Sequence, residues 1–191
     1  MIKREVYVSF LRGINVGGNK IIPMVDLKRM FEELGFDDVK TYIQSGNVVF
    51  VSPKKAPSLL EQAITEGIKN QFGIDVGNIV LSKEKLEKTI ELNPFRQVKT
   101  EGGSRIYFTL MMDSPSKEKV AALEEMKKKI TMTGGADDDV RVVGRTIYVL
   151  CRNGWSKSPF NSSTTEKVLK VDTTSRNFET MSRLAEMAGV R

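Results

Sequence analysis

Histidine is missing from the 191 residues of this chain. A protein without histidine has no Ser-His-Asp triad, no Cys-His dyad and no histidine-ligated zinc or haem. Any general base must then be a carboxylate, a lysine, a tyrosine, a cysteine or the substrate itself. We expect neither a metal site nor a cofactor, and whether the protein is an enzyme stays open.

Cysteine and long apolar segments are also scarce. The single cysteine, Cys151, excludes an intramolecular disulfide and fits a reducing cytoplasm. Because Cys151 ends an apolar segment, we expect it to be a small buried residue. No segment approaches the ~18 apolar residues of a membrane span, and the N-terminus does not resemble a signal peptide. The sequence therefore predicts a cytoplasmic protein without a membrane partner, and it does not predict the oligomeric state.

Acidic residues are fewer than basic ones, 24 against 30, which gives a net charge of +6. Residues 1–95 hold 13 Lys and Arg against 12 Asp and Glu (+1), and residues 96–191 hold 17 against 12 (+5). Such an excess favours anionic partners, either a phosphate-bearing small molecule or nucleic acid, but ordinary solubility requires charge too. The acidic run 137–139 is interpreted as a solvated turn rather than a magnesium site.

Hydrophobic periodicity predicts the same order of elements in both halves, namely strand, helix, two strands in a hairpin, helix, strand and a further helix. This order is typical of an α+β fold made by tandem duplication of two ferredoxin-like βαββαβ-type units. We expect antiparallel sheets with helices on one face, and an extra C-terminal helix. The first unit is placed at residues 1–96, a polar linker at 97–104 and the second unit at 105–191.

Two helix ends carry strong local signals. Gly35 follows the apolar pattern of the first helix and is predicted as its C′ residue. Ser58 and Glu61 have the spacing of a capping box and predict the start of the second helix.

A glycine-rich stretch, F-L-R-G-I-N-V-G-G-N-K, follows the first strand. Its spacing approaches that of the P-loop, but Asn19 replaces the lysine and Ile21 replaces the magnesium-binding hydroxyl. Two interpretations remain. Either the glycines only connect strand and helix tightly, or Arg12, Asn15 and Lys20 bind an anion together with the main chain of Gly17 and Gly18.

Longer motifs link the chain to a family. The motifs are L-R-G-I-N-V-G-G, T-Y-I-Q-S-G-N-V-V-F, N-P-F and T-T-S-R-N-F-E-T. Together they resemble a widespread bacterial family, the domain of unknown function 1697 family. The usual form of the last motif is T-T-R-N-W-N-T, so Ser175 is an insertion here and Phe178 stands in place of tryptophan. The resemblance implies a bacterial cytoplasmic protein with two ferredoxin-like units, and it implies no assigned activity.

Further polar residues are candidates for a binding site. Ser45 and Asn47 lie in the predicted turn of the first hairpin, and Ser156 and Lys157 lie in G-W-S-K-S, which imitates a nucleophile elbow without its final glycine. We expect the loop after the first strand and the first hairpin turn to lie at opposite ends of their sheet. The site is therefore placed between the units, with residues such as Arg176 and Asn177 completing one end.

Two strands begin with aromatic patterns like those of RNA-recognition folds. The third-strand motif of those folds is absent, so Tyr7 and Tyr107 are interpreted as sheet-packing residues.

These observations favour a binding protein for an anionic ligand. An enzyme that acts on such a ligand without histidine is one alternative. A scaffold for protein partners is another.

Overall fold

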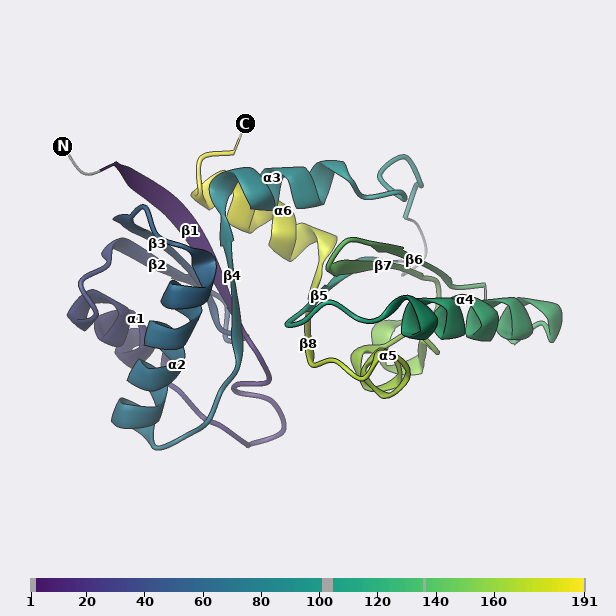
Figure 1. Cartoon of the computed structure of the whole chain (residues 1–191), viewed down its shortest axis with the longest axis horizontal. Coiled ribbons are helices and arrows are strands. Elements are labelled where there is room, and N and C mark those ends of the chain that lie inside the picture. The colour runs from purple at the N-terminus through teal and green to yellow at the C-terminus, as the bar shows by residue number, and fades with distance from the viewer. Residues whose placement is uncertain (1–2, 101–104, 136, 191) are drawn as a thin grey trace. The chain divides into compact units, whose positions relative to one another are not determined.

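The computed structural model describes residues 3–100, 105–135 and 137–190. Two four-stranded sheets organise them, as Figure 1 shows. In chain order the first sheet and its helices are β1 (Arg4–Leu11), α1 (Met24–Glu33), β2 (Asp37–Tyr42), β3 (Asn47–Pro53), α2 (Pro57–Phe72) and β4 (Asn78–Ser82), followed by α3 (Lys83–Glu91). The second set is β5 (Arg105–Met111), α4 (Lys117–Met132), β6 (Asp139–Val143), β7 (Thr146–Cys151), the short 3₁₀ helix η1 (Trp155–Lys157), α5 (Ser162–Leu169), β8 (Thr173–Asn177) and α6 (Phe178–Met187).

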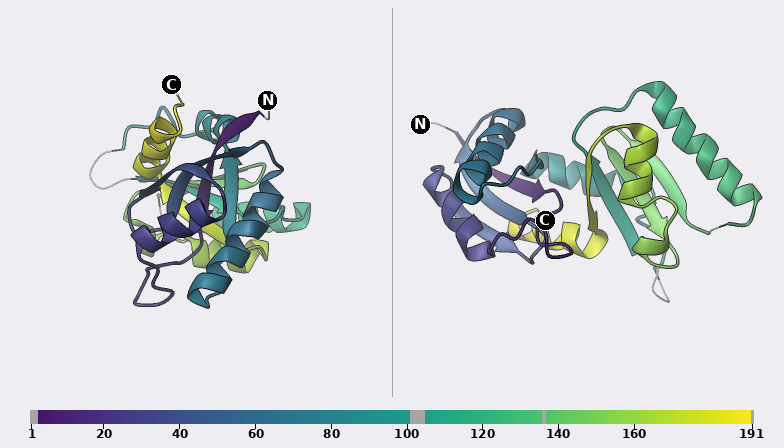
Figure 2. Two further views of the ribbon diagram at one scale, coloured as in Figure 1. Left: turned by 90° about the vertical axis from the view of Figure 1, so that its left-hand side faces the viewer. Right: turned by 90° about the horizontal axis from the view of Figure 1, so that it is seen from below.

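The first sheet has the strand order β2-β3-β1-β4, and all neighbours are antiparallel. This is the ferredoxin-like arrangement. Strand β3 lies between β1 and β2, which α1 connects, and β1 lies between β3 and β4, which α2 connects. Helices α1 and α2 cover one face (Figures 1 and 2), where Phe31 of α1 meets Phe50 of β3 edge to face at 5.4 Å. Tyr7 is buried in the same core and stacks on Phe50 at 5.8 Å, which confirms its interpretation as a sheet-packing residue.

The second sheet repeats the arrangement with the order β6-β7-β5-β8, again antiparallel throughout. Its core on the helix side includes Leu123 of α4, Leu169 of α5 and Val149 of β7. Tyr107 of β5 packs against this core and stacks on Trp155 with ring centroids 4.2 Å apart. The predicted fold class, a duplicated ferredoxin-like α+β fold with a C-terminal helix, is confirmed.

The chain divides into two compact units. Unit 1 comprises Met1–Lys88 and Ser182–Arg191, and unit 2 comprises Thr89–Met181. Helices α3 and α6 therefore each contribute residues to both units. The boundaries expected from the sequence, 1–96 and 105–191 with a linker at 97–104, stay a prediction, and positions 101–104 of that linker lie outside the described residues.

The end of α1 is a Schellman motif, as the position of Gly35 predicts. Gly35 has a φ of +82°, and its N–H donates to the carbonyl of Glu32 at 2.9 Å. The N–H of Phe36 donates to the carbonyl of Phe31 at 3.3 Å, and the two phenyl rings pack at 5.8 Å. Both orphan carbonyls are thus satisfied, and the helix ends in an apolar contact.

The predicted capping box of α2 is wrong. The helix begins at Pro57 with Ala56 as its N-cap residue, and no side chain caps it. Glu61 instead accepts a hydrogen bond from the backbone N–H of Val80 in β4 at 2.9 Å. The carboxylate of Glu61 therefore connects α2 to the edge strand β4 instead of capping the N-terminus of the helix.

The acidic run that leads into β6, residues 137–139, is also more than a solvated turn. Asp138 is buried, and its carboxylate accepts from the N–H of Arg152 at 2.7 Å and from the thiol of Cys151 at 3.7 Å. Cys151 is buried as predicted, and burial raises the pKa of its thiol to about 11. The next residue, Asp139, pairs with Arg141 at 2.6 Å. Among the described residues no cluster of acidic or cysteine side chains is suited to a metal ion.

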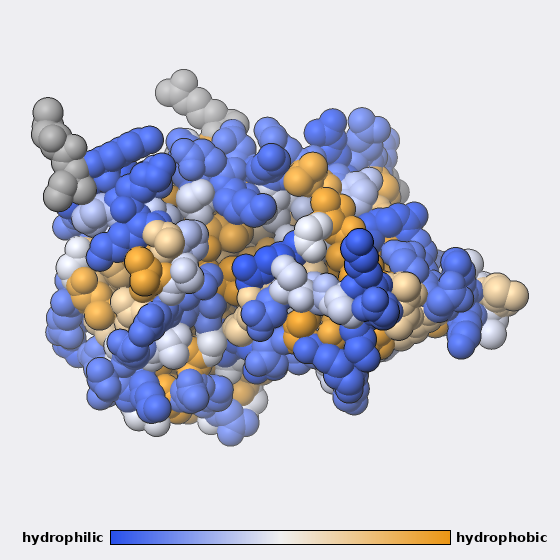
Figure 3. All heavy atoms as spheres, viewed as in Figure 1, coloured by the Kyte–Doolittle hydropathy of each residue, from blue (hydrophilic) through white to orange (hydrophobic). Residues whose placement is uncertain are grey.

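The surface is mostly hydrophilic on the face that Figure 3 shows, with apolar residues scattered between the polar ones. In the parts of the chain that the structure describes, no helix is both long and apolar enough to cross a bilayer.

Candidate functional site

Three connections of unit 1 meet at one end of the strands of its sheet, where β1 and β2 end and β3 and β4 begin. We call this end the loop edge. The connections are residues 12–23 after β1, residues 43–46 between β2 and β3, and residues 73–77 before β4. Two main-chain hydrogen bonds hold the end of β1 between the other two connections. The N–H of Leu11 donates to the carbonyl of Gly46 at 2.8 Å, and the N–H of Arg12 donates to the carbonyl of Gly77 at 2.9 Å. We call this pair of bonds the strand clamp.

This arrangement corrects one expectation from the sequence. The loop after β1 and the β2–β3 turn were expected at opposite ends of the sheet, but they lie at the same end. Strand β3 is antiparallel to both β1 and β2, so β1 and β2 run in the same direction and end together. The premise for placing the site between the units is therefore wrong, while that placement itself stays a prediction.

The glycine-rich stretch forms a narrow two-residue hairpin. Gly17 and Gly18 have φ values of +58° and +77°, which a type I′ turn requires at both central positions. Val16 and Asn19 flank the turn as a bridge, and the N–H of Asn19 donates to the carbonyl of Val16 at 3.1 Å. A Cβ at either glycine would meet no atom within 4 Å, so backbone conformation rather than crowding requires glycine here. The glycines thus give the loop its shape, which agrees with the interpretation that they make a tight connection between strand and helix.

Asn15 ties this hairpin to the rest of the loop edge. Its side-chain oxygen accepts from the N–H of Ile22 at 2.8 Å. Its side-chain nitrogen donates to the carbonyls of Ile22 at 3.0 Å and Gln44 at 2.9 Å. Both ends of the amide thus bind the main chain, and they join two connections, so Asn15 positions the loop.

Lys20 is the exposed cation of the loop edge. Its ammonium group donates to the carbonyl of Asp75 at 2.6 Å, which anchors the side chain across to the connection before β4. An ammonium group has three donors, so two remain for a ligand. Arg12, half-buried at the end of β1, lies in the same connection.

The β2–β3 turn is closed by its own polar residues. Asn47 is fully buried, and its side-chain nitrogen donates to the carbonyl of Tyr42 at 3.1 Å and to the hydroxyl of Ser45 at 3.0 Å. Gly46 has a φ of +72° and lies against Leu11 and Ile14. Ser45 and Asn47 are therefore close to the glycine-rich loop, but their polar groups hold the turn.

The remaining predicted site residues belong to unit 2. Ser156 and Lys157 are exposed in the 3₁₀ helix η1, whose turn differs from a nucleophile elbow. Arg176 of β8 is almost fully buried, and it donates to the hydroxyl of Thr174 and to the carbonyl of Ser175, both at 2.8 Å. Burial lowers the pKa of Arg176 to about 10. Asn177 accepts from the N–H of Thr180 at 2.8 Å and so caps α6.

A family model described as Protein of unknown function (DUF1697) matches residues 4–148, which include the whole loop edge. The chain belongs to this family. A search of the curated proteins found no match for this DUF1697 chain.

A solved structure described as that of a conserved bacterial protein from Streptococcus pneumoniae is similar to this DUF1697 chain over nearly its full length. The TM-score is 0.68 at 21% sequence identity, with 97% of this chain and 99% of the other covered. At this identity the likeness shows the fold alone.

Unit 2 of this DUF1697 chain repeats the strand clamp. The N–H of Met111 donates to the carbonyl of Arg145 at 3.0 Å, and the N–H of Met112 donates to the carbonyl of Asp172 at 2.9 Å. These bonds join the end of β5 to the β6–β7 turn and to the segment before β8, as the clamp of unit 1 does for β1. The guanidinium of Arg145 also donates to the carbonyls of Met111 and Met112, a role that its place in the sequence did not reveal.

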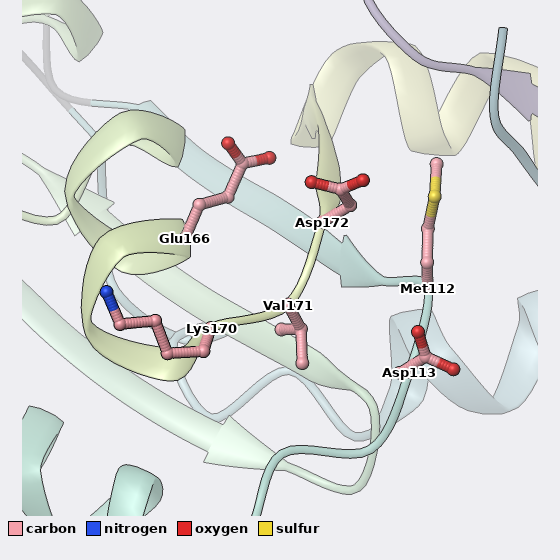
Figure 4. Close-up of a pocket in the computed structure, with 6 residues that line it drawn as sticks. All are labelled: Met112, Asp113, Glu166, Lys170, Val171 and Asp172. Carbon is pink, nitrogen blue, oxygen red and sulfur yellow. The ribbon is translucent and has the colours of Figure 1, made fainter.

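Beside this second clamp lies a cavity of about 460 Å³ (Figure 4). The residues that line it are Met112, Asp113, Glu166, Lys170, Val171 and Asp172. Carboxylates outnumber the single ammonium group, so the cavity does not suit an anion. Glu166 is also structural, because it accepts from the N–H and the hydroxyl of Thr173 at 2.8 and 3.0 Å. Its residues come from helix α5 and two separate connections, 112–116 and 170–172, which no single sequence motif joins.

Proposed function

We propose that this DUF1697 protein binds an anionic ligand at the loop edge of unit 1. The observation that carries the proposal is the convergence of two motifs that are distant in the sequence. The glycine-rich loop and the β2–β3 turn meet at one edge, and Asn15 joins them by a hydrogen bond to the carbonyl of Gln44.

The charges of the loop edge favour an anion over a cation, because Arg12 and Lys20 outnumber its one acidic residue, the exposed Asp75. Lys20 and Arg12 both lie in the connection after β1, and Lys20 is anchored to a main-chain carbonyl, so its ammonium group is held in place. A cation held in advance loses less side-chain entropy when a phosphate binds. The carboxylate of Asp26, in the first turn of α1, is already paired with Arg29 at 2.7 Å.

Exposed aliphatic side chains near these cations favour a ligand with apolar surface as well as charge. Val16 and Ile21 are 64% and 67% exposed, and Ile43 of the β2–β3 turn is half exposed. Nucleotides and nucleic acids combine phosphate with the apolar faces of bases, and both remain within the proposal.

The test measures binding of two probes, inorganic pyrophosphate by calorimetry and a fluorescent single-stranded oligonucleotide by anisotropy. Binding of pyrophosphate alone identifies a small phosphate ligand, and binding of the oligonucleotide alone identifies nucleic acid. For the oligonucleotide, two phosphate contacts predict a slope of about −1.4 in log K against log salt, and Lys20→Ala should change it by about 0.7.

Lys40→Ala is the matched control, because Lys40 is an exposed lysine of the same unit on β2. The proposal fails if neither probe binds. It also fails if Lys20→Ala and Arg12→Ala bind as tightly as wild type, or if Lys40→Ala weakens binding as much as Lys20→Ala. The enzyme and scaffold alternatives stay predictions, since no particular observation at this edge favours them.

A further inference from the structure

Unit 1 also contains a cavity, at the end of its sheet away from the loop edge. Its volume is about 510 Å³, within the range of pockets that take small molecules. It is formed by the start of β1, the connection between β3 and α2, and the junction of β4 with α3. None of its residues belongs to the loop edge, so the inference below does not rest on the proposed function.

One side of the cavity is a closed polar network. The hydroxyl of Tyr7 lies 3.1 Å from both the carboxylate of Glu5 and the carbonyl of Lys55, and it accepts from the N–H of Lys55 at 3.2 Å. The other carboxylate oxygen of Glu5 is 3.2 Å from the ammonium of Lys54. Burial raises the pKa of Glu5, but hydrogen bonds from Lys54 and Tyr7 outweigh it, and the net pKa is lowered. The same oxygen of Glu5 lies 3.6 Å from the ammonium of Lys3, so the charge of Glu5 is already compensated by Lys54 and Lys3.

Two charges of opposite sign remain at the same cavity. Lys55 and Glu84 both line it, and among the described residues neither has an oppositely charged side-chain group within 4.0 Å. Glu84 accepts only a 3.3 Å hydrogen bond from the hydroxyl of Ser82 within that part of the chain. The two side chains thus face one space without forming an ion pair.

The start of α2 adds positive potential on the Lys55 side. Ala56 and Pro57, which line the cavity, are the N-cap and first residue of this helix, and no side chain caps it. The partial positive charge of an uncapped helix start therefore lies beside the ammonium of Lys55. It reinforces Lys55 as the pole that would receive a negative group.

We propose that this cavity binds a small zwitterion, a free α-amino acid or a molecule that presents the same ammonium and carboxylate groups. The ligand carboxylate binds Lys55 at the start of α2, and the ligand ammonium binds Glu84. A simple anion leaves Glu84 without a positively charged partner, and a simple cation leaves Lys55 without a negatively charged one. Only a ligand with both charges pairs both side chains as it displaces water from them.

The test is a calorimetric titration of the whole protein with the common L-amino acids at millimolar concentration. We expect at least one to bind. Its N-acetyl derivative and its methyl ester, which each remove one charge, should bind at least about tenfold more weakly, since a hydrogen bond to a charged group contributes about 1.5–3 kcal/mol.

Charge-removing variants test the two poles separately. Lys55→Met and Glu84→Gln should each weaken binding at least about tenfold. Lys40→Met, at an exposed site outside the cavity, should not change it. The proposal is overturned if no amino acid binds, if the N-acetyl derivative or the ester binds as tightly as its parent, or if both variants bind like wild type. The pyrophosphate and oligonucleotide titrations concern the loop edge, so either proposal can fail alone.

Discussion

Replacing Gly46 with alanine tests whether the β2–β3 turn packs against the end of β1. Gly46 has a φ of +72°, and a Cβ there would lie 2.7 Å from Leu11 Cβ and 2.8 Å from Ile14 Cδ1. A left-handed backbone costs a residue with a side chain about 1–2 kcal/mol. Forcing a methyl group into a packed site costs about 1–3 kcal/mol more. We therefore expect Gly46→Ala to lower the free energy of unfolding by about 2–5 kcal/mol.

Gly73→Ala is the matched control, because it changes the backbone term alone. Gly73 has a φ of +68°, and a Cβ there would meet no atom within 4 Å. Its expected loss is about 1–2 kcal/mol. Urea denaturation followed by far-UV circular dichroism measures the free energy of unfolding of both variants. The two values can be compared if the m-value is unchanged. Equal losses of unfolding free energy in the two variants would refute the reasoning, because Leu11 and Ile14 would then not pack tightly against Gly46.

Three further predictions concern single side chains. Asn15→Ala removes three hydrogen bonds to the main chain and should lower the free energy of unfolding, measured in urea, by about 2–3 kcal/mol. The control is Asn19→Ala, because the side chain of Asn19 makes one long hydrogen bond of 3.4 Å. A similar loss in both variants would contradict the prediction. Cys151, with its pKa raised from 9.0 to about 11, should carry about 100-fold less thiolate in the folded protein than in urea, so a thiol reagent should label the native protein far more slowly, and equal rates would count against burial. Glu5 has a folded-state pKa below its ordinary 4.5, so its carboxylate stabilises the fold above that value and loses this effect as the pH falls through the folded pKa. The stability difference between wild type and Glu5→Gln should therefore shrink from about pH 7 to about pH 3, and a constant difference in urea midpoints would argue against the pairing.

Local signals in the sequence predicted much of the fold. Gly35 marked the end of α1 because a left-handed C′ residue is a property of a few neighbouring residues. The S-x-x-E pattern at Ser58 and Glu61 misled, because the partner of Glu61 is Val80 in the strand after the helix. A local pattern does not show that a distant strand presents an N–H in need of an acceptor.

The site was harder to predict than the fold, because its residues meet through strand order. The identities of Arg12, Asn15 and Lys20 stood out as polar residues in an apolar context. Their proximity to the β2–β3 turn depends on β3 lying between β1 and β2, an order that no short motif encodes but that the predicted ferredoxin-like fold implies. Once that order is known, parallel strands must end at the same edge, and the earlier separation of the two motifs is excluded.

The repeated strand clamp has a consequence for how the two halves have diverged. Its bonds use only main-chain atoms, so the same bonds form in both units although the residues differ: Gly46 and Gly77 accept in unit 1, and Arg145 and Asp172 accept in unit 2. Unit 2 closes its edge with a short connection, residues 112–116, where unit 1 has residues 12–23 with the glycine hairpin. Unit 2 therefore shows that this fold forms without a glycine hairpin after its first strand. The connection in unit 1 is longer and ordered, so it carries an entropic cost that the shorter connection of unit 2 does not, and burial of its Ile14 and Ile22 in the core offsets part of that cost. Exchange of this longer connection for that of unit 2 would separate what the edge does from what the fold needs.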